Sequence, residues 1–444
     1  MHRQVNRRFF LQTSALGAAH LLTRRTARAA DVNGKLRVAS IGTGNKGGDD
    51  LREVSASPRV LVTALCDVDQ TKPHMGWAAE RFPQAERFTD YRRLLDKADL
   101  FDAVIVSTPD HMHAPIALAA MALGKHVYCQ KPLTHTVNEA RQMRLAAERS
   151  RVVTQMGNQI QSHHSYRTAV KLLQEGVIGK VRAVHAWQAG EMSWLLANDR
   201  PQGSDPIPET LDWNLWLGVA PERPYKTKIY HPFNWRGWQD FGSGQLGDFG
   251  CHILDPVAMG LGLTAPISIQ AEAPPLNNEV WARKSKVSYV FPGSGLTAGD
   301  TLPVTWYDGH EHKPELSELS LPTEFKLPGS GSIVLGESGS MLIPHWDVPK
   351  LFPEEKFRDY KLPKLEDVNH YTGWAHACLG DGATTSNFGY AGPLTESVLL
   401  GVVAIRFPGE KLLWNASTAK ITNHAAANER LTTAYRSGFA PPTV

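Results

Sequence analysis

The sequence predicts an α/β protein of two domains, in which a parallel sheet wound with helices precedes a mostly antiparallel sheet. Short apolar runs alternate with amphipathic stretches over residues 35–158, and a glycine-rich turn, Gly42–Gly47, follows the first of these runs. From Val181 onward, strand-like alternation appears between long segments rich in proline, glycine and tryptophan. We therefore expect one domain at 35–158 and a second at 159–444.

The strands of the first domain are expected as nearly continuous apolar runs, because helices cover both faces of such a sheet. These runs are 36–41, 60–66, 103–107, 126–129 and 152–156. Helices are expected at 116–123, at 137–149, and at 165–175 before Gly176. The second domain is expected to contain strands at 181–187 and 286–291 and a buried helix at 393–405 that starts with proline.

Composition excludes several classes of function. The 444 residues can bury a large core, and the 47 basic and 44 acidic residues are interspersed, so no basic patch for nucleic acid is expected. Residues 1–29 hold six arginines and no acid, which leaves a net charge of about −3 on the remaining chain. No later segment is expected to span a membrane. Four widely separated cysteines are predicted to be buried and unpaired: Cys66, Cys129, Cys251 and Cys378.

The first 29 residues have the layout of a twin-arginine signal peptide. Arg7 and Arg8 precede an apolar stretch, 11–22, that is too short to span a membrane, and a small-residue site follows at 27–29. Because this route moves folded protein, a bound cofactor can travel with the chain. We expect a periplasmic or otherwise exported protein whose partner is the twin-arginine export machinery. The alternative is a basic amphipathic start with an accidental arginine pair.

The glycine turn follows a strand and precedes a helical stretch, which is the position of the phosphate-binding turn in a Rossmann domain. Asp67 ends the second strand 23 residues after Gly44, where a carboxylate can bind ribose hydroxyls and repel a 2′-phosphate. The cofactor predicted is therefore NAD, with NADP disfavoured. A turn needed only for packing is the alternative. The turn residues expected at the cofactor are Gly42, Thr43, Gly44, Asn45, Lys46 and Gly47.

Two polar blocks follow the next strands and emerge at the carboxyl edge of the sheet, where open α/β folds bind ligands. With the turn, they resemble the Gfo/Idh/MocA oxidoreductase superfamily, the glucose-fructose oxidoreductase and inositol dehydrogenase group, over nearly the whole chain after the signal. The usual Thr-Pro-Asn appears as 108–110 and the usual Glu-Lys-Pro as 130–132, with Gln130 replacing a carboxylate that touches the nicotinamide ribose. Further cofactor contacts are expected from Ser107, Thr108, Pro109, His113, Gln130, Lys131 and Asn158.

A third block, 244–255, carries Asp248 and His252 four residues apart, on one face if the segment is helical. The resemblance implies a catalytic group of Lys131, Asp248 and His252. In it, His252 takes the proton of a substrate hydroxyl, Lys131 polarises that oxygen, and Asp248 orients both. A hydride leaves carbon readily only as the hydroxyl loses its proton, and imidazole titrates in the useful range. Taken alone, His252 fits a satisfied core histidine better than a catalytic one, and the Lys-Pro and glycine-turn blocks reverse this preference.

Aromatic side chains with interspersed donors surround the expected pocket, a combination that holds sugars but also serves ordinary packing. The substrate contacts predicted are Gln159, Tyr230, His231, Trp235, Arg236 and Trp374. His163 and His164 are adjacent and point different ways, which makes them poor metal ligands, and no metal site is expected.

The resemblance implies an NAD(H)-dependent oxidoreductase acting on a hydroxyl of a carbohydrate or glycoside. Its antiparallel sheet would form one wall of the site and a dimer interface, so a homo-oligomer is expected. An exported enzyme lacks a dependable pool of free NAD, and we expect a tightly bound cofactor that is recycled in place. One alternative is a redox-neutral NAD-dependent glycosidase. Such an enzyme oxidises the sugar transiently, cleaves the glycosidic bond by elimination, and then reduces the sugar again, which restores the cofactor. The other is a non-catalytic cofactor-binding sensor, which predicts loss of Lys131 or His252.

Overall fold

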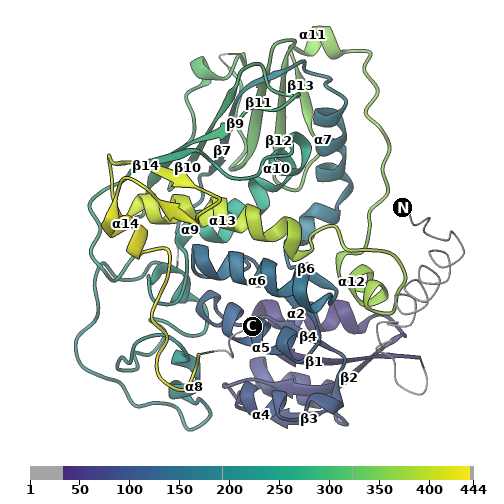
Figure 1. Cartoon of the computed structure of the whole chain (residues 1–444), viewed down its shortest axis with the longest axis vertical. Coiled ribbons are helices and arrows are strands. Elements are labelled where there is room, and N and C mark those ends of the chain that lie inside the picture. Colours follow the sequence, from purple (N-terminus) through teal and green to yellow (C-terminus); the bar gives the residue numbers. More distant parts are fainter. Residues whose placement is uncertain (1–33, 193, 323, 441–444) are drawn as a thin grey trace, which may run out of the picture.

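The computed structural model describes residues 34–192, 194–322 and 324–440, which form two sheets with helices between them (Figure 1). The expected signal peptide at 1–29 lies outside these residues. The first sheet has six parallel strands in the order β3-β2-β1-β4-β5-β6, which is the Rossmann order. Its strands are β1 (Leu36–Ile41), β2 (Val60–Cys66), β3 (Glu86–Phe88), β4 (Ala103–Val106), β5 (His126–Cys129) and β6 (Thr154–Met156).

The crossovers between these strands are helical, as the alternating pattern predicts. The helices of this domain are α2 (Asn45–Ser55), α3 (Trp77–Arg81), α4 (Tyr91–Leu95), α5 (His113–Ala122) and α6 (Val137–Ser150). Every side chain of β4 is buried, and so is nearly every side chain of α5, in agreement with their apolar composition. The predicted runs at 36–41, 60–66 and 126–129 match the observed strands to the residue.

The second sheet has nine strands in the order β13-β12-β11-β7-β10-β9-β8-β14-β15. All neighbouring pairs are antiparallel except β7 and β10, which confirms the mostly antiparallel prediction. The strands are β7 (Val181–Gln188), β8 (Ser268–Glu272), β9 (Ser285–Pro292), β10 (Thr301–Asp308), β11 (Ser330–Gly336), β12 (Ser340–Pro344), β13 (Lys350–Phe352), β14 (Lys411–Asn415) and β15 (Lys420–Ile421).

The helices α9 (Gly244–Ile253) and α13 (Phe388–Ile405) lie between the two sheets (Figure 1). The long helix α13 packs on α6 of the first domain and on α9, and α10 packs on α7. These and the remaining helices are α7 (His164–Gln174), α8 (Trp213–Leu217), α9 (Gly244–Ile253), α10 (Asp255–Leu261), α11 (Glu354–Phe357), α12 (His370–Cys378), α13 (Phe388–Ile405) and α14 (Ala425–Glu429).

The helix α13 begins before the predicted proline start. Asn387 caps it by accepting a hydrogen bond from the backbone N–H of Tyr390, so Pro393 lies inside the helix. By length and composition this apolar helix could cross a membrane, but 83% of it is buried in the protein, where it forms the core between the two sheets. It is therefore a core helix in the described part of the chain.

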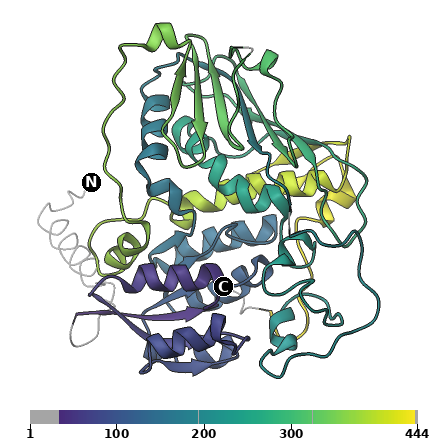
Figure 2. The ribbon, with the colours of Figure 1, turned by 180° about the vertical axis from the view of Figure 1, so that it is seen from behind.

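Several segments after residue 158 pack on the first domain rather than on the second sheet. The helix α12 packs on α2, and Trp374 and Cys378 belong to the same core cluster as strands β1 and β2. Near the C-terminus, Tyr435 donates a hydrogen bond to Glu139 of α6. The segments 189–192 and 194–243, the second of which includes α8, run beside the first domain (Figures 1 and 2). We call these two segments together the strap. All four cysteines are buried and free, as predicted.

Candidate active site

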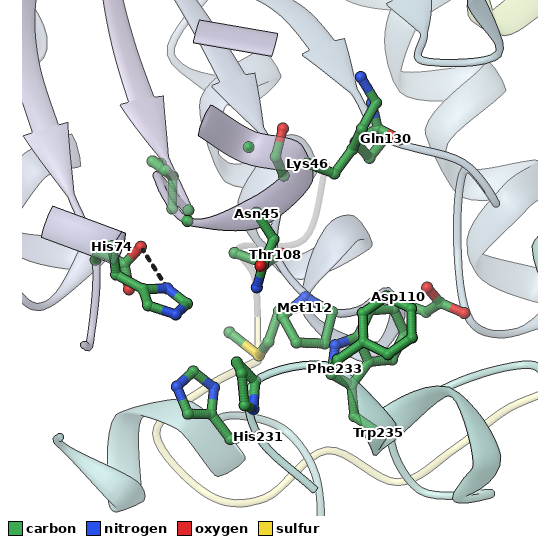
Figure 3. A pocket seen from close by; sticks show the side chains of 18 of the residues that line it. Asn45, Lys46, His74, Thr108, Asp110, Met112, Gln130, His231, Phe233 and Trp235 are labelled. Atoms are coloured by element: carbon green, nitrogen blue, oxygen red, sulfur yellow. Dashed lines mark ion pairs between the residues drawn. The ribbon is translucent and has the colours of Figure 1, made fainter. Parts of the chain in front are cut away.

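A cavity of about 420 Å³ lies where strands β1, β2, β3, β4 and β5 of the first sheet end, and it is bordered by the strap, α9 and the turn after β12. Figure 3 shows Asn45 at the tip of the glycine turn, with Thr108 and Met112 beyond it and His231, Phe233 and Trp235 on the facing strap. The cavity is therefore built at the carboxyl edge of the parallel sheet, where ligands bind in open α/β folds.

The glycine turn has no room for a Cβ at Gly42, Gly44 or Gly47, and at Gly47 the Cβ would lie 2.2 Å from the carbonyl oxygen of Gly42. Gly42 has φ +83°, and a Cβ there would lie 2.5 Å from the carbonyl oxygen of Ser107. A Cβ on Gly44 would collide with the imidazole ring of His74. Gly44 is also the N-cap of α2 and has no side chain to satisfy the first turn, so the amide end of this helix is available to an anion.

Asp67 holds the turn rather than standing apart from it. Its carboxylate accepts hydrogen bonds from the Thr43 backbone N–H at 2.7 Å and the Thr43 hydroxyl at 3.1 Å, and from the Asp69 N–H at 2.9 Å. Asp67 still lines the cavity. The same carboxylate thus fixes the glycine turn and lines the cavity, and its contact with a ribose stays a prediction.

Gln130 is explained by a buried carboxylate that no motif in the sequence marks. Asp50, on α2, is fully buried and accepts hydrogen bonds from the Gln130 amide and the Ser107 hydroxyl, both at 2.7 Å. It also pairs with Lys46 at 2.8 Å. A glutamate at 130 would bring a second carboxylate against Asp50, which is unfavourable in a buried site. The amide and the buried acid are therefore complementary.

The two domains meet in a buried ion pair. The Lys131 ammonium, which follows β5, donates hydrogen bonds to the Asp248 carboxylate at 2.7 Å and to its backbone carbonyl at 2.9 Å. The Arg236 guanidinium, from the strap, donates to the same carboxylate oxygen at 3.3 Å. Burial alone would raise the pKa of Asp248, but Lys131 and Arg236 outweigh burial and hold that pKa well below its usual value.

His252 lies one helical turn after Asp248, as the spacing predicts, and it lines the cavity. Burial, together with the positive charge of Lys131, holds its pKa well below the usual value, so the imidazole is neutral. Its Nδ1 atom is buried and makes no hydrogen bond to any described residue. The carboxylate of Asp248 acts on His252 through charge, by opposing this fall in pKa, and its hydrogen bonds go to Lys131 and Arg236.

Asp110 is a further member of this cluster. In the sequence it is only a departure from the usual asparagine, yet its buried carboxylate lines the cavity and accepts a hydrogen bond from the Ser243 N–H at 3.1 Å. Burial raises its pKa to about 7, and the negative charge of Asp248 adds to the rise. The site therefore holds one ionised and one titrating carboxyl group.

Most of the predicted site residues line this one cavity. They are Gly42, Gly44, Asn45, Lys46, Gly47, Asp67, Ser107, Thr108, Pro109, Gln130, Lys131, Gln159, His231, Trp235, Arg236 and His252. Asp248 lies behind Lys131 and contacts it directly. Buried polar atoms without a partner among the described residues occur in three lining side chains, those of Thr108, Gln159 and His252. Such atoms, with the glycine turn, fit a polar ligand such as a dinucleotide.

Five residues that were predicted to contact the cofactor or the substrate do not line the cavity, because their side chains lie behind the residues that form its surface. His113 has both ring nitrogens 2.8 Å from backbone carbonyls, those of Pro132 and Thr108, and therefore ties two site loops together. Thr43 is buried against Asp67, and the Asn158 amide oxygen accepts from Ser386. Two aromatic side chains predicted at the substrate are fully buried in core clusters instead: Tyr230 and Trp374.

Other lining residues carried no signal in the sequence. His345 and Trp346 come from the turn after β12, nearly a hundred residues beyond His252, and no motif marks them. Phe233 lies next to residues that were predicted, and Arg236 stacks on its ring. His74 carries no motif of its own, although it follows the acid at the end of β2. Only the packing of distant segments brings these four together.

Comparison with known proteins identifies the family to which both domains are similar. Residues 36–158 match the Gfo/Idh/MocA family model described as "Oxidoreductase family, NAD-binding Rossmann fold". Residues 164–296 match the companion model described as "Oxidoreductase family, C-terminal alpha/beta domain". Together the two matches cover more than half of the chain.

Curated relatives are similar over part of their length. A glycosyl hydrolase family 109 protein of Shewanella pealeana is 28% identical over 219 residues, which are 44% of this chain and 48% of that protein. Levoglucosan dehydrogenase of Pseudarthrobacter phenanthrenivorans is 28% identical over 178 residues, 40% of this chain and 37% of that protein. The chain thus spans about half or less of the length of these relatives.

A solved structure extends the likeness to the whole fold. The WlbA dehydrogenase of Bordetella pertussis, in complex with NADH and UDP-GlcNAcA, superposes with a TM-score of 0.60 at 16% identity, over 86% of this chain and 99% of that one. At this identity the likeness concerns the fold, and it includes both domains.

The raised pKa of Asp110 predicts a pH dependence of stability. The unfolded carboxyl titrates near 3.9, about three units lower than in the fold, so between those values the folded state binds more protons than the unfolded state. This group therefore makes the protein less stable as pH rises through that window. Asp110→Asn removes this titrating group and with it the loss of stability. The free energy of unfolding, measured in urea at about pH 4 and pH 7, should therefore differ less between the two pH values than in wild type. Asp300→Asn, at an exposed position, should keep the wild-type difference; an unchanged difference in Asp110→Asn would contradict the assignment.

The position of Asp67 predicts a change in nucleotide preference. Asp67→Ala removes both the acceptor for the glycine turn and the charge that repels a 2′-phosphate, so affinity for NAD should fall and the preference for NAD over NADP should shrink. Titration of nucleotide-free protein with each nucleotide measures both effects. Asp49→Ala, on the exposed side of α2, is the control. A variant with the wild-type ratio would mean that Asp67 does not face the 2′ position.

Proposed function

The chain belongs to the Gfo/Idh/MocA family of NAD-binding oxidoreductases, and we propose from this premise that it oxidises a hydroxyl group of a carbohydrate or glycoside with a tightly bound cofactor that is recycled in place. The observation that carries the proposal is the arrangement of Lys131 and neutral His252 in the cavity that the glycine turn also lines. When bound, NAD supplies a carbon that accepts hydride from the substrate.

The residues of the site divide the remaining work. Neutral His252 accepts the proton of the substrate hydroxyl, because an imidazole with a lowered pKa is already unprotonated at neutral pH. The Lys131 ammonium stabilises the negative charge that develops on that oxygen. Asp248 and Arg236 act as positioning residues, since together they fix where the ammonium points. The amide end of α2 and the turn at Gly42–Gly47 would hold the pyrophosphate of the cofactor.

The strap supports retention of the cofactor. The His231 imidazole lies 2.7 Å from the carboxylate of Asp69, which follows β2, so the strap is fastened to the first domain beside the glycine turn. Hydrogen bonds from His231 and Thr71 hold the pKa of Asp69 well below its usual value, although burial alone would raise it. Retention of the cofactor is consistent with the export that the arginine pair predicts. We propose that the protein is exported to the periplasm by the twin-arginine route. We also propose that it forms a homo-oligomer.

A second candidate is redox-neutral cleavage of a glycoside. Transient oxidation makes a neighbouring ring proton acidic, and removal of that proton requires a base besides His252. Asp110, whose pKa is raised to about 7, stands in the same cavity and is suited to this second transfer. The similarity to a glycosyl hydrolase family 109 protein also favours it. A sensor without catalysis is disfavoured, because Lys131 and His252 are both present in the cavity.

Retention predicts that purified protein carries NAD(H) at near-stoichiometric amounts through gel filtration. Nucleotide released by acid and quantified by chromatography measures the content, and the same elution gives the oligomeric state. His231→Ala should lose nucleotide during the run, because the fastening to Asp69 is gone. His164→Ala, on the exposed start of α7, should retain it. Nucleotide-free protein that is fully active without added NAD would contradict the proposal.

The proposed roles predict large losses of turnover in single variants. Lys131→Ala and His252→Ala should each lower kcat by ~10²–10⁴-fold while the nucleotide content stays intact, because general acid-base groups contribute factors of that size. The Asp248→Asn substitution should lower kcat by a smaller factor. Lys171→Ala on the outer face of α7 is the control. Losses below about tenfold would remove these residues from the mechanism.

Recycling predicts that turnover of a single glycoside leaves the average redox state of the bound cofactor unchanged, with a transient rise in the absorbance of reduced nicotinamide. Redox-neutral cleavage adds exchange of a ring proton with solvent deuterium, measured by mass spectrometry of the product. Transfer between two sugars would instead give a stable reduced enzyme that reoxidises only with the second sugar. Steady release of NADH, matched to product and dependent on added NAD, would contradict both versions.

A further inference from the structure

Trp346 is unusual among the tryptophans of this protein. All twelve lie in the described part of the chain, and Trp346 alone is exposed, with 53% of its surface accessible to solvent. It lines the same cavity as Lys131 and His252. A large aromatic side chain held open to solvent beside reacting groups provides a flat apolar face for a ligand.

The backbone of Trp346 is strained. Its φ is +72°, in the left-handed region that bulky side chains rarely adopt, at the turn after β12. Glycine or asparagine would fit this turn with less strain, so tryptophan at this position costs stability rather than adding to it. Strain of this kind is concentrated at functional sites, where the surrounding fold maintains it.

The distance of Trp346 from the reacting groups defines what it can bind. The ring of His252 lies 5.6 Å from that of His345, and the ring of His345 lies 5.7 Å from that of Trp346. The Tyr166 hydroxyl hydrogen-bonds His345 Nδ1 at 2.8 Å and so holds the middle ring in place. The centre of the Trp346 ring therefore lies no more than about 11 Å from that of the His252 ring, a span that a substrate of two rings can bridge.

We propose that Trp346 is the stacking platform for a second ring of the substrate, which makes the preferred substrate class glycosides of two or more rings, including sugars with a ring-shaped aglycone. This inference rests on the proposed function, because the reacting sugar must lie at Lys131 and His252. Sugars present apolar C–H faces that stack on aromatic rings, and the exposed indole offers such a surface. His345 lies between the two subsites, and its ring is next to the rings of both His252 and Trp346.

The test uses matched probes and the intact protein as purified. Methyl and 4-nitrophenyl glycosides of glucose, galactose and N-acetylgalactosamine form one-ring and two-ring pairs, with cellobiose as a two-sugar probe. Isothermal titration measures binding, and the absorbance of reduced nicotinamide measures oxidation, for wild type, Trp346→Gly and Trp346→Phe. Arg151→Gly is the control for strain, because Arg151 has φ +55° at the exposed end of α6, away from the cavity.

A platform predicts opposite changes in stability and binding. Trp346→Gly should keep or raise Tm, because it relieves the left-handed backbone, and should weaken two-ring probes about tenfold while one-ring probes change less than about twofold. Trp346→Phe should keep most of the two-ring affinity. Arg151→Gly should likewise keep or raise Tm, with no change in binding.

Three outcomes would overturn the platform. Wild type that shows no preference for two-ring over one-ring probes excludes a second subsite. A fall of several degrees in the Tm of Trp346→Gly means that the side chain serves packing, and a loss of oligomeric state in that variant means that a second copy of the chain covers it. In each case one-ring glycosides would still reduce the cofactor if the proposed function holds. Failure of every probe to give even a transient rise in reduced nicotinamide would instead count against the proposed function.

Discussion

The buried ion pair between Lys131 and Asp248 is the contact on which the site depends. Lys131 follows a strand of the first sheet and Asp248 lies on α9, so the pair joins the two domains at the reacting position. Removing Asp248 would leave the Lys131 and Arg236 cations facing each other without their shared carboxylate, whereas removing Lys131 would leave Asp248 paired with Arg236 alone. The same two charges set the state of their neighbours. The positive charge favours neutral His252, and the negative charge favours protonated Asp110.

Three distant segments keep this pair in place. The helix α13 fills the space between the sheets, α12 returns to pack on the first domain, and the strap is fastened beside the glycine turn by His231 and Asp69. None of these contacts touches the reacting atoms. They fix the separation of the two halves of the cavity, and in a close-packed interior a small change of that separation would shift Lys131 relative to His252.

The two candidate reactions share their first step and differ in the second. Both begin with removal of a hydroxyl proton by His252, and only the redox-neutral cleavage needs a second proton transfer, for which Asp110 is available. A buried carboxyl with a pKa near neutrality is costly for the fold, as is the left-handed backbone of Trp346. Both costs lie in the same cavity, which is where proteins retain features that do not serve stability.

The sequence by itself determined five of the six parallel strands, the glycine turn and the shared face of Asp248 and His252, because periodicity and helical spacing are local properties. It also indicated the Lys131 block through resemblance. Only the tertiary structure decided that His113 and Trp374 face away from the cavity, that Gln130 is matched by buried Asp50, and that Asp110, His345 and Trp346 belong to the site. Whether each of these side chains points into the cavity depends on how segments over a hundred residues apart pack together. A local sequence pattern carries no information about that packing.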